Sequence, residues 1–159
     1  MEYVLVRGEI KSGHGVASGK AKDQRYPEGT LKKQYNYFLE RGLDLGNYFM
    51  GTINVDISPN AFKIKKPKHF FKNIAWSDFI SPENFYFFDV ALHYNNEVYQ
   101  GYVYLPDPET KEEHIQMPTI LELILPKITG MEYGVIVDIE LQTDQLDIIT
   151  SKLIEQETV

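Results

Sequence analysis

The stretch Gly51–Ile57 alternates apolar and polar residues, and this pattern constrains the fold of the chain more than any other. Three branched aliphatic residues alternate with three polar ones: Ile53, Val55 and Ile57 against Thr52, Asn54 and Asp56. A period of two places successive side chains on opposite faces of a β-strand. We therefore predict a strand with one apolar face for a core and one polar face.

The polar face of this predicted strand carries a hydroxyl, an amide and a carboxylate, which are all hard oxygen donors. Mg²⁺ binds through oxygen ligands, few of them from the protein and the rest from water or substrate phosphate. Gly51 would let a phosphate or a second backbone approach closely. Two interpretations follow from the residues alone: a magnesium site, or an edge strand with a solvated face, where Thr and Asn are common.

Three blocks of the chain resemble the archaeal CTP-dependent riboflavin kinases, in that family's order. Gly51-Thr52-Ile53-Asn54-Val55 is similar to the family's Gly-Thr-Leu-Asn-Val motif and to the Pro-Thr-Ala-Asn motif of the ATP-dependent flavokinases. Gly8-Glu9-Ile10-Lys11-Ser12-Gly13-His14-Gly15 resembles its first strand and Gly-x-Gly loop. Leu121-Glu122-Leu123-Ile124-Leu125-Pro126 resembles its Glu-Ile-Ile-Ala-Pro segment, so that the resemblance spans roughly residues 3 to 141.

The resemblance implies a function and a set of site residues. The function is transfer of a phosphoryl group from CTP to riboflavin with Mg²⁺, which yields FMN. Thr52 and Asn54 would hold the metal ion, and Thr110 and Glu122 would contact the flavin. Glu122 is the lone acid in the run Ile120–Leu125, and we expect strand alternation to aim its side chain into the mouth of the barrel. The nucleotide would lie against two loops, formed by Gly13, His14, Gly15 and Val16 and by Lys127, Ile128, Thr129 and Gly130.

The chain departs from the family pattern at both nucleotide loops. The first continues as Val16-Ala17-Ser18-Gly19-Lys20, where the family tends to have Glu-Gly and an aromatic residue. The second is Lys127-Ile128-Thr129-Gly130, where the family has Lys-Leu-Arg, so the arginine is absent. These departures keep a second hypothesis open, a flavin- or nucleotide-binding module without catalysis. A third is a structural protein whose C-terminal helix contacts a partner.

Hydrophobic periodicity and turn signals predict a mostly β fold. Residues 30–41 form the clearest helix, with an apolar stripe of Leu31, Tyr35, Phe38 and Leu39 closed by Gly42. Short strands separated by turn signals favour a barrel of about six strands, and the resemblance implies a cradle-loop barrel over residues 1–141. Residues 142–159, with Leu146, Ile149 and Leu153 at helical spacing, predict a C-terminal helix that packs on the barrel or joins a homo-oligomer.

Composition excludes several classes of function. The net charge of −7 argues against non-specific nucleic-acid binding, although aromatic residues alternate with lysines between residues 62 and 79. The absence of cysteine excludes disulfides and thiolate metal sites. The chain has no apolar run long enough to span a membrane, and residues 1–10 lack a signal-peptide core. We therefore expect a cytoplasmic protein that acts on small molecules.

Overall fold

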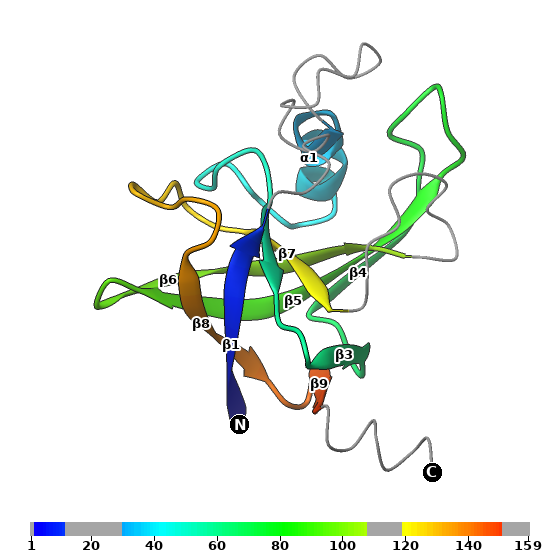
Figure 1. The fold of residues 1–159 in the computed structure, drawn as a ribbon. Helices are drawn as coiled ribbons and strands as arrows, with labels where there is room; N and C mark the ends of the chain where they lie inside the picture. Colours follow the sequence, from blue (N-terminus) through cyan, green and yellow to red (C-terminus); the bar gives the residue numbers. More distant parts are fainter. Residues whose placement is uncertain (1, 12–29, 108–118, 151–159) are drawn as a thin grey trace.

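A computed structural model describes residues 2–11, 30–107 and 119–150, and it has one helix and antiparallel strands in this part of the chain (Figure 1). The helix is α1 (Thr30–Glu40). The strands are β1 (Tyr3–Lys11), β2 (Ile53–Asp56), β3 (Ala61–Ile64), β4 (His69–Ile74), β5 (Glu83–Tyr94), β6 (Glu97–Pro106), β7 (Ile120–Ile124), β8 (Ile136–Gln142) and β9 (Leu146–Ile149). The predicted mostly β fold with one main helix is confirmed. The described helix is too short and too polar to cross a membrane.

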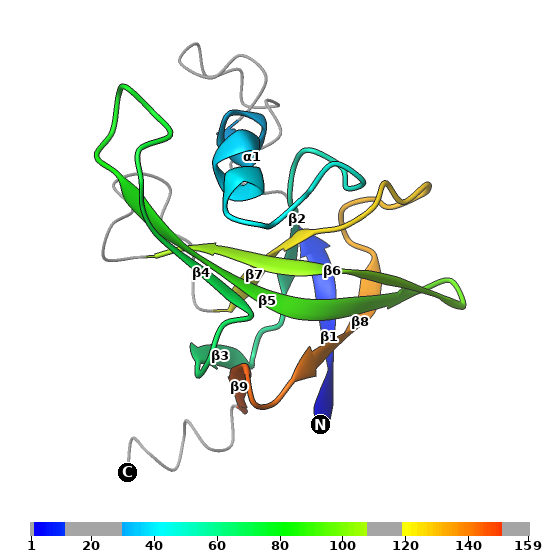
Figure 2. The ribbon, with the colours of Figure 1, turned by 180° about the vertical axis from the view of Figure 1, so that it is seen from behind.

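Six strands form a ring of hydrogen-bonded neighbours. The order β5-β6-β7-β2-β1-β8 returns to its start, because β8 also pairs with β5. Within it, β5, β6 and β7 are consecutive neighbours and β8 returns beside β5, which is the Greek-key arrangement. The long strand β5 makes closure possible, since its first half pairs with β4 and its second half with β8 along the same edge (Figure 2).

Gln145 fills the point where β5 changes partner from β4 to β8. Its side-chain oxygen accepts the Asp89 backbone N–H at 2.8 Å, and its amide nitrogen donates to the Asp89 carboxylate at 2.8 Å. Its backbone oxygen accepts the N–H groups of Lys65 and Lys66. A side chain thus replaces strand pairing at Asp89 and links the ring to the small β3–β9 sheet.

Gln145→Ala is expected to lower the free energy of unfolding by about 2–3 kcal/mol, because it leaves the Asp89 N–H and carboxylate without these partners. Urea unfolding followed by tryptophan fluorescence measures the effect. Gln100→Ala, at an exposed position of β6, is the matched control and should change stability by less than about 0.5 kcal/mol. Equal stability of the two variants would contradict the bridging role of Gln145.

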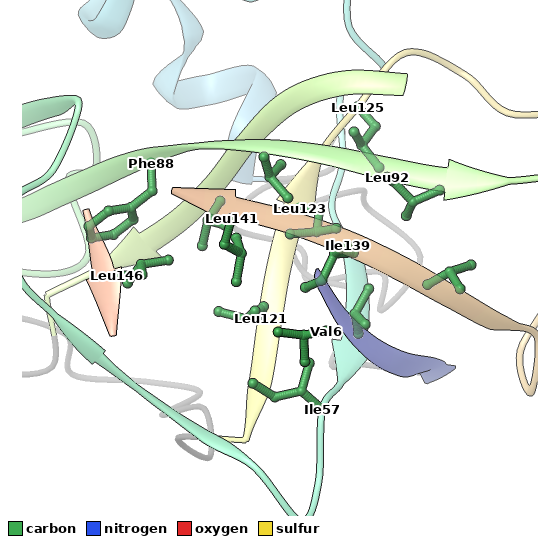
Figure 3. Packing of buried hydrophobic residues seen from close by; sticks show 14 of the residues in the cluster. Val6, Ile57, Phe88, Leu92, Leu121, Leu123, Leu125, Ile139, Leu141 and Leu146 are labelled. Atoms are coloured by element: carbon green, nitrogen blue, oxygen red, sulfur yellow. The ribbon is translucent and has the colours of Figure 1, made fainter. Parts of the chain in front are cut away.

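The ring encloses the main hydrophobic core. Every strand of the ring sends apolar side chains inward, where they meet (Figure 3). Buried examples are Val6, Val55, Phe88, Val90, Leu92, Val103, Leu121, Leu123, Val137, Ile139 and Leu141. The predicted apolar face of the Gly51–Ile57 stretch is therefore confirmed, since Val55 and Ile57 are fully buried in this core.

A second core lies on the outer face of β4, β5, β6 and β7, beneath helix α1. Six of its eleven buried members are aromatic. The members are Leu31, Phe38, Leu43, Leu45, Phe71, Ile74, Trp76, Phe85, Phe87, Tyr104 and Ile124. Phe38 of α1 contacts the rings of Phe85 and Phe87 edge-on, at centroid distances of 5.1 and 5.0 Å. Helix α1 thus covers one outer face of the sheet.

The helix ends as predicted but buries a partly different stripe. Gly42 has φ +96°, and the N–H groups of Gly42 and Leu43 bond to the carbonyls of Leu39 and Phe38, which is a Schellman ending. The prediction that Leu39 belongs to the buried stripe is wrong, since its side chain is 42% exposed. Gln34 is buried instead, because helix α1 packs on its Leu31–Gln34–Phe38 side.

The predicted C-terminal helix is wrong in the described part of the chain. Leu146–Ile149 forms strand β9, which pairs with Ala61–Ile64 of β3. Leu146 and Ile148 pack against the ring core, so a strand period of two accounts for these apolar residues as well as a helical period does. Residues 151–159, including Leu153, lie outside the described residues.

Candidate functional site

A row of polar side chains crosses three strands on the outer face of the ring. Asn54 of β2 lies directly opposite Glu122 of β7, and Glu122 lies directly opposite Tyr104 of β6. Their sequence neighbours Val55, Leu123 and Val103 point into the ring core, so strand alternation sends these three outward. We call Asn54, Glu122 and Tyr104 the polar row.

Thr52 joins the polar row from the residue just before β2. Its hydroxyl donates a hydrogen bond to Glu122 Oε1 at 3.2 Å, across 70 residues of sequence. Asn54 shares the outward direction with Thr52 and is 8% exposed. A hydroxyl, an amide and a carboxylate therefore meet at one place, and each offers an oxygen that can bind a hard cation.

The expected direction of Glu122 needs a correction. Alternation within residues 120–125 suggested that its carboxylate points into the mouth of the barrel. Leu121 and Leu123 instead fill the ring interior, so Glu122 points to the outer face on the side covered by helix α1. The sequence pattern correctly separates Glu122 from its apolar neighbours, but only the closure of the ring decides which side is inside.

Gln34 and Tyr104 form the buried end of this arrangement. The Tyr104 hydroxyl donates to Gln34 Oε1 at 2.7 Å, and the side chains are 3% and 1% exposed respectively. Burial raises the pKa of Tyr104 well above its usual value, and the negative charges of Glu122 and Glu83 add to the shift. Tyr104 is therefore a neutral hydrogen-bond donor.

Neither Gln34 nor Tyr104 is among the site residues predicted from the sequence. A polar residue at position 34, one turn from both Leu31 and Phe38, is a signal that was available. Tyr104 offers no comparable signal, because it stands among aromatic residues in the second half of β6, which is covered on both faces. Only the strand register shows that Tyr104 lies opposite Glu122.

The polar row continues to the end of β1 on its other side. Lys11, the last described residue before the predicted glycine loop, pairs with Asn54. Its ammonium lies 2.9 Å from Glu9, and this hydrogen bond and ion pair raise the pKa of Lys11. The predicted nucleotide residues Gly13, His14, Gly15 and Val16, and the predicted flavin residue Thr110, lie outside the described residues.

Asp56 follows Asn54 on the same face but has a local structural role. Its carboxylate accepts hydrogen bonds from the hydroxyl and backbone N–H of Ser58, at 2.6 and 2.9 Å. The Ser58 hydroxyl bond is the largest cause that lowers the pKa of Asp56. These bonds stabilise the turn that ends β2, so Asp56 contributes less to the site than Thr52 and Asn54.

The second predicted nucleotide loop begins at the end of the ring where Thr52 lies. Strand β7 leads into it, and the Phe49 N–H bonds to the carbonyl of Leu125, which ties residues 49–51 to the start of the loop. Lys127 and Thr129 are exposed, whereas Ile128 packs partly against the ring core. Gly130 has φ +84°, and its carbonyl accepts the Tyr94 hydroxyl. Lys127 and Thr129 are therefore the members of this loop whose side chains can reach a ligand.

Within the described ranges, no three His, Asp or Glu side chains gather as a ready-made metal centre. The candidate site offers one carboxylate, one amide and one hydroxyl, which suits a cation that takes most of its ligands from water and phosphate. It is unsuited to a structural zinc ion, which takes four Cys or His ligands.

His69 lies at the far end of the same outer face, next to aromatic rings. Its ring stacks on Phe71 at 5.8 Å and meets Tyr102 edge-on at 5.9 Å. Burial lowers the pKa of His69, and the positive charge of Lys68 lowers it further, while Asp89 opposes the shift. His69 is therefore an uncharged aromatic neighbour at neutral pH.

We expect an NMR titration of His69 to give a midpoint below the ordinary value of 6.5. Because the folded state binds the proton more weakly than the unfolded state, the stabilisation from His69 is present above pH 6.5 and is lost as the pH falls through the folded pKa. The variant His69→Gln identifies the His69 resonance by its loss from the spectrum. Its free energy of unfolding should depend less on pH than that of the wild type between the folded pKa of His69 and pH 6.5. A midpoint at or above 6.5 would contradict the burial of this ring.

No protein-family model matches this chain, and no curated protein matches it either.

Proposed function

We propose that the protein is a riboflavin kinase that transfers a phosphoryl group from CTP to riboflavin in the presence of Mg²⁺. The observation that carries the proposal is the hydrogen bond from Thr52 to Glu122. The resemblance assigns these two residues separately, Thr52 to the metal ion and Glu122 to the flavin. Phosphoryl transfer requires the two substrates side by side, and the two residues are in contact.

The donor set at this place is compatible with Mg²⁺. Thr52 and Asn54 would supply neutral oxygen ligands, and Glu122 adds a negative charge at hydrogen-bond distance from Thr52. When bound, Mg²⁺ supplies charge neutralisation to the transferring phosphate groups. Thr52 and Asn54 also bind and orient the nucleotide's phosphate end, while the buried strands behind them keep water from that side.

Glu122 would hold the acceptor, and Lys127 would interact with the donor. The carboxylate of Glu122 can accept hydrogen bonds from riboflavin hydroxyl or ring N–H groups. Lys127 is exposed on the loop after β7 and carries a positive charge toward nucleotide phosphates. In the reaction, a riboflavin hydroxyl oxygen bonds to the γ-phosphorus, the bond from this phosphorus to CDP breaks, and the hydroxyl proton is released.

A cradle-loop barrel is the finer fold assignment that accompanies this proposal. The closed order of six strands and the Greek-key connection are compatible with it. The departure at Thr129, where the family has arginine, favours the alternative of a flavin- or nucleotide-binding module without turnover. Lys127 is then the sole basic side chain of the Lys127–Gly130 loop.

The test is an assay with CTP, riboflavin and Mg²⁺ in which FMN is separated by chromatography, with ATP and GTP in parallel. The proposal expects FMN with CTP and none after chelation of Mg²⁺. Binding of riboflavin or nucleotide without FMN supports the binding module. Absence of both binding and turnover overturns both hypotheses and leaves a structural protein.

Glu122→Gln is expected to raise the Kd for riboflavin about tenfold, because it removes the charge from a hydrogen-bond acceptor. Thr52 can still donate to the amide oxygen of the variant, so the melting temperature should fall by only a few degrees. Calorimetric titration with riboflavin measures the effect. The control is Glu97→Gln, the same substitution at an exposed position of β6. Unchanged affinity would leave Glu122 with a structural role.

A further inference from the structure

The contact between Gln34 and Tyr104 is a buried polar pair within an aromatic cluster. The rings of Phe85 and Phe87 lie 5.8 and 5.9 Å from the Tyr104 ring. Two apolar side chains of similar size in place of Gln34 and Tyr104 would give the protein comparable stability. The reason is that replacing both partners of a buried hydrogen bond by apolar groups of the same shape changes the free energy of unfolding little. The pair therefore contributes a defined position more than it contributes stability.

Tyr104 connects the helix to the candidate site. It lies directly opposite Glu122 in the β6–β7 register, and such cross-strand neighbours have Cβ atoms about 4.5–5.5 Å apart. The charge of Glu122 also contributes to the raised pKa of Tyr104, so the two groups interact electrostatically. A shift of the Tyr104 ring would therefore change the surroundings of the Glu122 carboxylate.

Gln34 determines where the hydroxyl proton of Tyr104 points. A tyrosine hydroxyl has one proton to donate, and Gln34 Oε1 accepts it at 2.7 Å. The proton is therefore directed toward helix α1. Without Gln34, the buried hydroxyl would need another acceptor, and the nearest strand across from it carries the Glu122 carboxylate.

We propose that Gln34 is a positioning residue for Glu122: it holds the Tyr104 ring and hydroxyl, and it thereby couples helix α1 to the site formed by Thr52, Asn54 and Glu122. The effect on ligands rests on the proposed function, because it takes Glu122 as the flavin-binding group. The coupling itself is a property of the free protein and is measured without any ligand.

The first experiment is a double-mutant cycle of Gln34→Met and Glu122→Gln, with urea unfolding as the readout. Coupling through Tyr104 is expected to make the two effects on the unfolding equilibrium constant non-additive by about fivefold or more. The control cycle pairs Glu122→Gln with Leu31→Ala, which removes buried atoms one turn away on the same helix face. That cycle should be additive within about twofold. Additivity in both cycles overturns the proposal.

The second experiment compares ligand affinity. Gln34→Met and Tyr104→Phe should each raise the Kd for riboflavin about tenfold, because groups that orient a ligand-binding side chain typically have effects of this size. The Kd for CTP with Mg²⁺ should change by less than about twofold, and Leu31→Ala should leave both constants unchanged despite its loss of stability. If Gln34→Met acted only by destabilising helix α1, Leu31→Ala and Gln34→Met would instead change the two dissociation constants alike.

The outcomes separate this inference from the proposed function. If the wild type binds neither riboflavin nor CTP while the first cycle is non-additive, the proposed function fails and the coupling of Gln34 to Glu122 stands. If the wild type binds riboflavin and Gln34→Met binds it equally well, the proposed function stands and the positioning role is overturned.

Discussion

Thr52→Val is expected to abolish Mg²⁺-dependent nucleotide binding and kinase activity while the protein still folds. Valine has the shape of threonine but offers no oxygen, and Mg²⁺ sites contain few protein ligands, so the loss of one is severe. The variant also loses the hydrogen bond to Glu122, which should cost about 1–2 kcal/mol. For a chain of this size, that corresponds to a fall in Tm of about 2–8 °C.

Thr143→Val is the matched control for this substitution. Thr143 is also hydrogen-bonded through its hydroxyl, to the Glu2 carbonyl at 3.3 Å, but it lies between β8 and β9, away from the polar row. Titration of CTP with and without Mg²⁺, beside a thermal melt, tests both variants. If Thr52→Val binds CTP and Mg²⁺ as the wild type does, the strand has no metal role and the kinase proposal fails with it.

The structure makes Thr52 a better probe than Asn54. From the sequence, both stand on a polar face where substitution affects folding little. Asn54 is instead among the buried polar residues, between Lys11 of β1 and Glu122 of β7. Asn54→Ala would remove a buried polar side chain beside these two charged neighbours, so a loss of binding in this variant would combine site and stability effects.

Gly101→Ala is expected to produce the largest loss of stability among the single changes considered, about 3 kcal/mol or more. A Cβ on Gly101 would overlap the backbone carbonyl oxygen of Ile124 and press against the Leu125 side chain. Ile124 is the last residue of β7, and its backbone carbonyl cannot rotate away as the end of a flexible side chain can. Strands β6 and β7 would have to separate at the Tyr102–Ile124 end of their pairing, two residues along β6 from Tyr104, which lies opposite Glu122.

Urea unfolding of Gly101→Ala measures this loss, and Gln100→Ala on the preceding, exposed position of β6 provides the reference. Riboflavin affinity should fall in the same variant, because the β6–β7 pair positions Glu122. If Gly101→Ala has the stability of the wild type, the prediction is wrong, because β6 and β7 then leave room for a Cβ at this position.

The residues of the candidate site show which of its features could be predicted from the sequence. Alternation around Thr52 and Asn54, and the isolated acid at 122, each single out a polar residue on an otherwise apolar strand. That Thr52 and Glu122 touch could not be predicted from these patterns, because 70 residues separate them and strand register depends on the partner as much as on either segment. The direction of Glu122 was mistaken for the same reason.

The amino-acid sequence by itself determined the local structure of this protein: helix α1 with its glycine ending, the alternating strands, and the polar face of Gly51–Ile57. These depend on contacts between residues that are near one another in the chain. Tertiary structure alone decided that Leu146–Ile149 is a strand, that Gln34 replaces Leu39 at the helix interface, and that Tyr104 faces Glu122. In each case the deciding contact lies on a distant segment, β3 for Leu146–Ile149, and β6 for Gln34 and Glu122, so the local pattern did not contain the answer.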